Sequence, residues 1–188
     1  MQRLHIPLTA QLKITAFVVL SITAIEAINF FTARSLNVWG IVPRSTDSLL
    51  GILASPFLHG SLYHFSSNIV PLAIFSVLVL QHGLRRYSYA TIFIVLVTGV
   101  LVWLFGRSAI HIGASGLIYG YFGFLIVAGI VSREFKLVMI SIVVGLLYGG
   151  MIWGVLPTSS YISFESHLFG ALAGAAAGYL WGKDKTRN

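Results

Sequence analysis

The stretch HIGASGLIYG, residues 111–120, places a single serine among small residues, directly before a long apolar run. Glycine weakens the interior of an ordinary helix because it loses more backbone entropy on folding than any other residue. In a membrane, however, small residues are enriched where two helices approach closely. The stretch therefore indicates the start of a closely packed membrane helix, provided that the rest of the chain suits lipid.

The composition is that of an integral membrane protein. Of the 188 residues, 57% are hydrophobic and 9% are charged, whereas soluble domains carry about 25% charged residues. The chain has no cysteine, which excludes disulfides, cysteine-ligated zinc and a thiol nucleophile. The net charge of +7 is typical of cytoplasmic loops rich in Lys and Arg. No basic stretch interleaves with aromatic residues, so we expect no nucleic-acid partner.

Six apolar stretches come close to the roughly 20 residues that a transmembrane helix needs. They predict an all-α, polytopic membrane protein, in which a single domain, residues 1–188, forms a six-helix bundle. A long first outer loop, roughly residues 32–63, separates the first two spans. The predicted spans are 12–31, 64–81, 88–106, 115–131, 137–156 and 166–182.

The basic residues orient these spans, because Lys and Arg gather on the cytoplasmic side of a membrane. Nine of the 12 Lys and Arg residues fall on the side of the two termini. These nine are Arg3, Lys13, Arg85, Arg86, Arg133, Lys136, Lys183, Lys185 and Arg187. We therefore expect both termini in the cytoplasm, and spans two, four and six beginning at the outer surface.

The notable polar residues of the spans gather at that outer end. Ser115 begins the fourth span, His167 begins the sixth, and His64 and Asn68 lie at the start of the second. Polar side chains at membrane depth are costly and usually face the protein interior or a wet cavity. Three such helix starts at one depth predict one shared cavity.

A serine hydroxyl needs an adjacent base before it can act as a nucleophile, and His167 is the strongest candidate for that base. Glycines at four-residue spacing follow it, beginning with Gly170 and Gly174. Two glycine-faced helices that pack together would bring Ser115 and His167 within hydrogen-bond reach. From spacing alone, the other interpretation stays open, in which both are ordinary polar residues at helix ends.

Acyl transfer also needs donors for the developing oxyanion. His64 and Asn68 are four residues apart, so they share one helix face, and each side chain can donate a hydrogen bond. The backbone N–H of Ser115 is a third candidate, because the first N–H groups of a helix lack intrahelical partners. Equally open is that His64 and Asn68 cap the second span or bond the outer loop.

Other hydrolytic chemistries lack their residues. An aspartyl dyad fails because neither Asp47 nor Asp184 lies in a predicted span. HGSLYH has the wrong spacing and no glutamate for a zinc protease, so no metal is expected. Glu165 lies only two residues before His167 and so points to a different helix face. A two-residue Ser-His arrangement is what remains.

Three motifs together resemble the rhomboid family of intramembrane serine proteases. They are HGSLYHFSSN at 59–68, GASG at 113–116 followed by Tyr119, and SHLFGALAG at 166–174. Each is weak alone, but all three occur in the family's order and on the matching predicted spans. The resemblance implies a minimal, six-helix bacterial form in the inner membrane. It also implies that the protein needs no cofactor and cleaves single-span transmembrane substrates within the lipid.

The resemblance implies a role for each matching residue. Ser115 would be the nucleophile and His167 the general base. His64, Asn68 and the Ser115 backbone amide would form the oxyanion site. The supporting residues would be Gly113, Gly116, Tyr119, His59, Gly170 and Gly174.

Two of these supporting residues have more specific implied roles: Tyr119 would pack against the general base, and His59 would brace the outer loop. His111 and Arg107 match no role in the family pattern. Two features depart from it. Many bacterial members carry a Trp-Arg pair in the first outer loop, where this chain has Leu50-Gly51, and many have a glutamate near the inner end of the second span, which this chain lacks.

The leading hypothesis is peptide-bond hydrolysis in membrane-anchored proteins near the outer face. The substrate would reach the site past the fifth span and the loop LPTSSYIS, residues 156–163. A catalytically inactive rhomboid-like protein that binds membrane-protein clients is the alternative. A small transporter is a further rival, but it predicts polar groups along the whole pore, and the inner ends of spans two, four and six are apolar.

Overall fold

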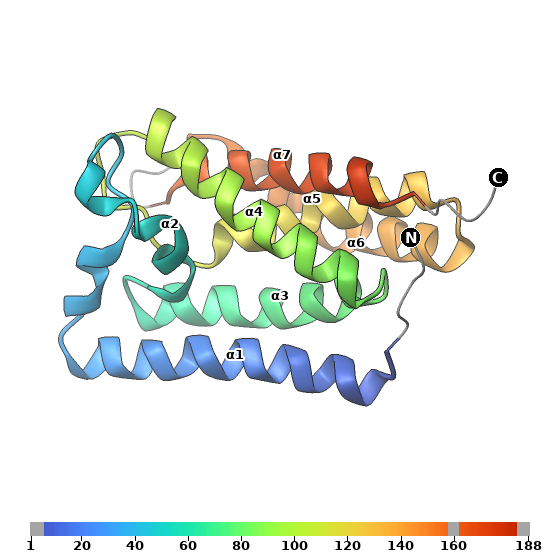
Figure 1. The fold of residues 1–188 in the computed structure, drawn as a ribbon, viewed down its shortest axis with the longest axis horizontal. Coiled ribbons are helices and arrows are strands. Elements are labelled where there is room, and N and C mark those ends of the chain that lie inside the picture. Colours follow the sequence, from blue (N-terminus) through green and yellow to red (C-terminus); the bar gives the residue numbers. More distant parts are fainter. Residues whose placement is uncertain (1–5, 158–161, 184–188) are drawn as a thin grey trace.

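The chain folds into a bundle of long helices (Figure 1), and a computed structural model describes residues 6–157 and 162–183. The long helices are α1 (Leu8–Phe31), α3 (Leu62–Leu80), α4 (Leu84–Phe105), α5 (Ser115–Ser132), α6 (Phe135–Tyr148) and α7 (Phe164–Trp181). The short elements are η1 (Ser35–Trp39), η2 (Thr46–Ser48), α2 (Gly51–Ala54), η3 (Ser55–Phe57) and η4 (Gly149–Val155). The described residues thus form an all-helical fold, as the sequence predicts.

Within the described residues, five segments are long and apolar enough to cross a membrane. They are α1, α3, α4, α5 and Phe135–Val155, which is α6 continued by η4. α7 has 18 residues but is not one of the five, because its glycines and its polar first turn, with Glu165 and His167, lower its mean hydropathy. The chain is a multi-pass membrane protein, and the count of six spans stays a prediction.

The observed helices differ from the predicted spans mainly at three places. α1 begins at Leu8 rather than at residue 12, directly after the extended Pro7, and α4 begins at Leu84 rather than at residue 88. The predicted span 137–156 is α-helical only to Tyr148 and continues as the 3-10 helix η4. The residues between α1 and α3, predicted as a long loop, contain the short helices η1, η2, α2 and η3.

α5 lies at the centre of the bundle, where it contacts α3, α4, α6 and α7. Of its 18 residues, 61% are buried, compared with 11% to 28% of the windows in the other candidate spans. A helix that is apolar on every side needs protein or lipid on every side, and for α5 the surroundings are mainly protein. The serine motif therefore begins the helix that the rest of the bundle surrounds.

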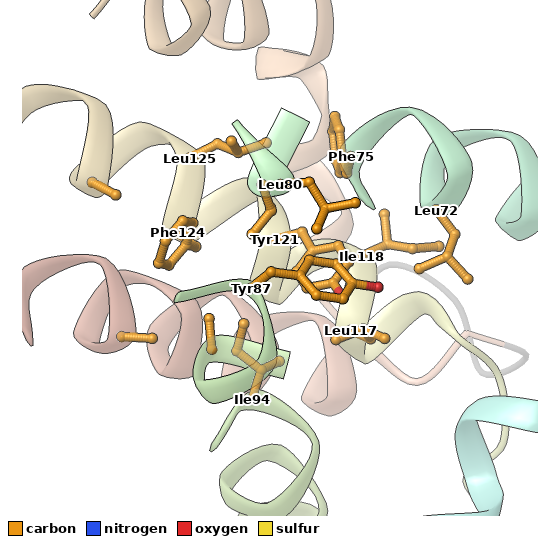
Figure 2. Close-up of a cluster of buried hydrophobic side chains, with 14 of the residues drawn as sticks. Leu72, Phe75, Leu80, Tyr87, Ile94, Leu117, Ile118, Tyr121, Phe124 and Leu125 are labelled. Atoms are coloured by element: carbon orange, nitrogen blue, oxygen red, sulfur yellow. The ribbon is translucent and has the colours of Figure 1, made fainter. Parts of the chain in front are cut away.

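A cluster of buried apolar side chains joins α3, α4 and α5 (Figure 2). Its fully buried members include Leu72 and Phe75 of α3, Ile94 of α4, and Tyr121 and Phe124 of α5. Lipid tails are as apolar as these side chains, so close van der Waals contact rather than the hydrophobic effect favours their association. The cluster therefore holds α5 at a defined position against its neighbours.

Three helices begin at the same end of the bundle. α3, α5 and α7 all start at the end that carries α2, whereas α1 starts and α7 finishes at the opposite end (Figure 1). The sequence motifs begin in or directly before the first turns of α3, α5 and α7. The fold therefore brings the three motifs to one end of the bundle.

Candidate active site

Ser115 is the first residue of α5. The chain reaches it through Gly113, whose φ of +120° lies in a region that other residues avoid because their Cβ would clash. The first N–H groups of a helix lack intrahelical partners. The helix start therefore supplies both a hydroxyl and a backbone donor at one position.

His64 lies against Gly113 and close to the serine. A Cβ placed on Gly113 would lie 2.7 Å from His64 Nε2 and 3.8 Å from Ser115 Oγ, so both atoms border the space that this glycine leaves open. The Gly60 N–H donates to His64 Nδ1 at 3.4 Å, which places the proton of the neutral ring on Nε2. His64 thus presents an N–H donor to the space beside Ser115.

Asn68 lies one turn further along α3 and is buried. Its Nδ2 donates to the His64 carbonyl at 2.7 Å, which leaves the second N–H of the amide for another acceptor. Its Oδ1 has no hydrogen-bond partner among the described residues. The N-cap of α3 is Ser61, whose Oγ accepts from the His64 N–H at 3.0 Å, so neither His64 nor Asn68 caps this helix.

His167 lies in the first turn of α7 and is held from two sides. Its ring stacks on Tyr119 of α5, with ring centroids 4.0 Å apart and planes 8° from parallel. Its Nδ1 lies 2.8 Å from the Gly154 carbonyl oxygen of η4. A carbonyl only accepts, so Nδ1 is the donor, and Nε2 of the neutral ring keeps its lone pair. His167 is therefore in the tautomer that a general base requires.

One cavity of about 830 Å³ unites these groups. Ser115, His167, His64 and Asn68 all line its wall, together with Tyr119. Among the described residues, no hydrogen bond joins Ser115 Oγ to His167; such bonds are often long without substrate and tighten in the Michaelis complex. No group of three or more His, Cys, Asp or Glu side chains gathers as a metal site within the described ranges.

Glycines set the distance between the serine helix and the histidine helix. A Cβ on Gly170 would overlap the Gly116 carbonyl oxygen, and a Cβ on Gly174 would overlap the Gly120 carbonyl oxygen. The backbones of α5 and α7 are therefore in direct contact, which only small residues allow. This contact brings the first turns of the two helices to the same cavity.

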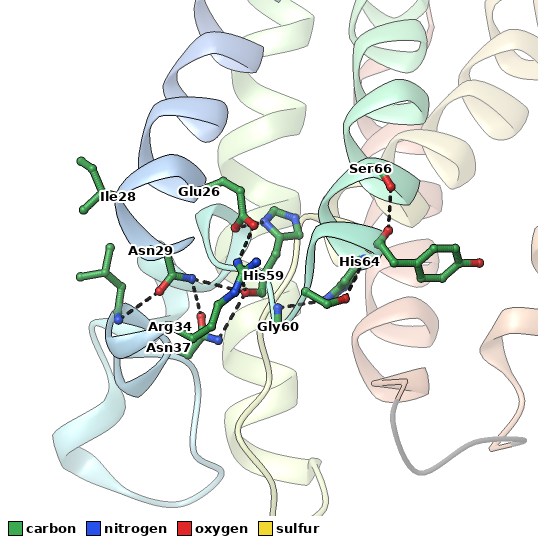
Figure 3. A network of polar contacts seen from close by, with 12 residues as sticks. Glu26, Ile28, Asn29, Arg34, Asn37, His59, Gly60, His64 and Ser66 are labelled. Atoms are coloured by element: carbon green, nitrogen blue, oxygen red, sulfur yellow. Dashed lines mark hydrogen bonds and ion pairs between the residues drawn. The ribbon is translucent and has the colours of Figure 1, made fainter. Parts of the chain in front are cut away.

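A polar network anchors the segment that precedes α3 (Figure 3). The backbone carbonyl of His59 accepts from Arg34 Nη1 at 3.1 Å, and from Asn29 Nδ2 and Asn37 Nδ2 at 3.3 Å each. Arg34 Nη1 also donates to Glu26 Oε1 at 2.5 Å. Glu26 and Asn29 belong to α1 and Asn37 to η1. The network therefore ties His59 to the end of the first helix.

The His59 side chain is fully buried within this network. Its Nδ1 lies 3.9 Å from Glu26 Oε2, but that carboxylate is already paired with Arg34. Burial, assisted by electrostatic interaction with His64 and Arg34, lowers the pKa of His59 from 6.5 to about 3. His59 is therefore neutral at physiological pH, which fits a structural role.

The structure also assigns contacts to residues that the motifs leave out. His111 Nε2 donates to the Arg107 carbonyl at 3.0 Å, and its Nδ1 accepts from Ser163 Oγ at 2.6 Å. Ser163 Oγ in turn lies 2.7 Å from Ser166 Oγ. The Arg107 N–H donates to Glu165 Oε1 at 3.2 Å. These bonds connect the first turn of α7 to the segment before α5. In the sequence, the feature that indicates them is a polar residue at each helix boundary.

Comparison with known proteins provides the family. The family model described as the Rhomboid domain matches residues 46–184. Uncharacterized proteins from Mycobacterium bovis and Mycobacterium tuberculosis are each 37% identical over 165 residues, which is 83% of this chain and 69% of theirs. An uncharacterized protein from Mycobacterium leprae is 35% identical over 165 residues, covering 83% of this chain and 65% of that protein. The matched range contains all three site helices, and the chain therefore belongs to the rhomboid family.

Proposed function

We propose that this protein is an intramembrane serine endopeptidase that uses Ser115 and His167. The observation that carries the proposal is the single cavity, which is lined by a helix-start serine, a histidine with a free Nε2, and two side-chain donors. Family membership supports the same reaction class. Glu165 contacts Arg107, and the Nδ1 of His167 is bound to a backbone carbonyl. Glu165 therefore does not take the place of a triad carboxylate, and the proposed mechanism uses a dyad.

In the proposed reaction, Ser115 Oγ attacks the scissile carbonyl carbon while His167 Nε2 accepts the hydroxyl proton. The negative charge that develops on the carbonyl oxygen is stabilised by His64 Nε2–H, the free N–H of Asn68 and the Ser115 amide. His167 then donates its proton to the leaving amine, which leaves an acyl-enzyme. Water hydrolyses the ester through the same base, and the serine is restored.

The fold and the charge distribution together support a membrane arrangement for the proposed function. We propose six spans, with α7 as the sixth, and a bacterial inner membrane in which both termini face the cytoplasm. The end of the bundle that holds the cavity then lies at the outer face, which would place the scissile bond of a single-span substrate near the outer surface of the lipid. The substrate would approach past α6 and the loop 156–163, of which residues 158–161 lie outside the described residues.

A single-span reporter and an active-site label test this function. Purified, reconstituted protein should cleave the reporter and react with a fluorophosphonate, and Ser115→Ala should lose both activities. Ser66→Ala removes an exposed hydroxyl from α3 and should keep both. Cleavage that survives Ser115→Ala would refute the mechanism. Reporter binding without cleavage or labelling would instead indicate the non-catalytic, client-binding alternative.

A further inference from the structure

The geometry points to Gly154 as a positioning residue. Through it, the orientation and tautomer of the proposed catalytic base, His167, depend on the position of η4. This inference rests on the proposed function of His167 and concerns what holds its ring. Gly154 belongs to η4, which continues α6 along the chain. Two independent features of this glycine, its carbonyl and its missing side chain, carry the argument.

The first feature is the carbonyl. The last carbonyl groups of a helix lack intrahelical partners, and the oxygen of Gly154 lies near the end of η4. It accepts from His167 Nδ1 at 2.8 Å. This bond selects the tautomer with an unprotonated Nε2 and fixes the rotation of the ring. In a Ser-His-Asp triad a carboxylate orients the histidine in the same way, so here a backbone carbonyl takes that position.

The second feature is the absence of a side chain. A Cβ on Gly154 would overlap the hydroxyl of Tyr119 and would lie 3.3 Å from His167 Nδ1. Tyr119 is the residue on which His167 stacks. The glycine therefore lets η4 approach the back of the stacked pair. Gly149 and Gly150, in the same 3-10 helix, differ sharply, because a Cβ on either would meet nothing within 4 Å.

The location of η4 at the edge of the bundle matters for this contact. Only 11% of the apolar window in the span formed by α6 and η4 is buried, so few of its side chains are enclosed by other helices. η4 itself contacts α6 and α7. An outward displacement of η4 would carry the Gly154 carbonyl away from Nδ1 and free the ring to rotate. The base is therefore oriented while η4 lies against α7 and loses its orientation when η4 moves away.

The test compares Gly154→Ala with Gly150→Ala, which adds the same methyl group to open space. We expect Gly154→Ala to lower kcat by about 10²-fold, the scale of a small misplacement of a catalytic group. KM should change little, and Gly150→Ala should match the wild type. ¹⁵N-histidine NMR, with His167 assigned by its loss in His167→Asn, should show the Nδ1–H tautomer in the wild type and in Gly150→Ala but not in Gly154→Ala. Because this spectrum does not depend on proteolysis, it separates the inference from the proposed function.

A second variant guards against simple misfolding. Tyr119→Phe removes the hydroxyl that the new methyl group would strike, so Gly154→Ala/Tyr119→Phe should recover part of the kcat and part of the Nδ1–H signal lost in Gly154→Ala. Wild-type kcat and tautomer in Gly154→Ala would overturn the inference. So would a loss in Gly154→Ala that is accompanied by a lower unfolding temperature and not relieved in the double variant.

Discussion

The buried imidazole of His59 should make the stability of this protein fall as the pH falls. The ring is fully buried between the end of α1 and the start of α3. The titratable and charged groups that face it are Glu26, Arg34 and His64. Glu26 is neutralised by Arg34 at 2.5 Å and so does not hold a proton on the imidazole. Protonation would therefore place an uncompensated charge in a buried site.

The sign and size of the effect follow from the two pKa values. The folded state holds His59 at a pKa of about 3, against 6.5 for an unperturbed histidine. Below pH 6.5 the unfolded chain binds a proton that the folded chain does not. The stability contributed by neutral His59 is thus complete above pH 6.5 and is lost as the pH falls towards 3. Between pH 7 and pH 5 the loss amounts to about 2 kcal/mol.

The assay is the free energy of unfolding in detergent micelles at pH 7 and pH 5, for the wild type and for His59→Phe. Phenylalanine keeps an aromatic ring beside Phe65 and His64, which His59 contacts edge-on, but it cannot titrate. The wild type should lose about 2 kcal/mol more than the variant over this range. Titrations of groups that do not face His59 affect both proteins alike and cancel in the difference. Equal losses in the two proteins would refute the reasoning.

Three further predictions concern the site and its supports. Asn68→Ala should lower kcat by about 10²-fold, the effect of losing one oxyanion donor, as measured by reporter cleavage; unchanged kcat would remove Asn68 from the oxyanion site. Gly174→Ala should destabilise the fold by about 1–3 kcal/mol in an unfolding titration because its methyl group would meet the backbone of α5. Gly145→Ala, whose methyl group would have its nearest contact 3.6 Å away, should not destabilise the fold. Equal effects of the two substitutions would contradict the close contact between α5 and α7. His111→Phe should lower kcat by about tenfold through loss of its bond to Ser163. His111→Asn, which keeps an acceptor near the Nδ1 position, should recover part of that activity, and no difference between these two variants would contradict a role for the bond.

Much of the architecture could be predicted from local sequence. Long apolar runs specify membrane helices because the backbone must satisfy its own hydrogen bonds in lipid, and the predicted ranges overlap the observed helices throughout. The 3-10 conformation of η4 was not predicted, since η4 continues the same apolar run as α6. Membership of the rhomboid family was predicted from three motifs and is confirmed by the family match.

The candidate site also has features that the sequence indicates and features that it does not. Motif spacing identified the candidates Ser115, His167, His64 and Asn68, which the fold gathers around one cavity. It did not identify Gly154, because every residue has a backbone carbonyl and the pattern of side chains does not show which carbonyl binds the histidine. Nor did it explain Glu26, whose partner Arg34 lies beyond the end of α1. Their roles depend on segments that are distant in sequence or separated by a helix end.

The sequence alone determined that this chain enters a membrane and where its helices run, and it supplied the candidate residues for the proposed acyl transfer. Those properties depend on composition and on spacing within one helix, which are local. Only the tertiary structure decided which ring nitrogen of His64, His111 and His167 carries the proton, which contacts hold the ring of His167, and which glycines admit a neighbouring backbone. Those properties depend on atoms brought together from different helices, and a linear pattern does not specify such distances.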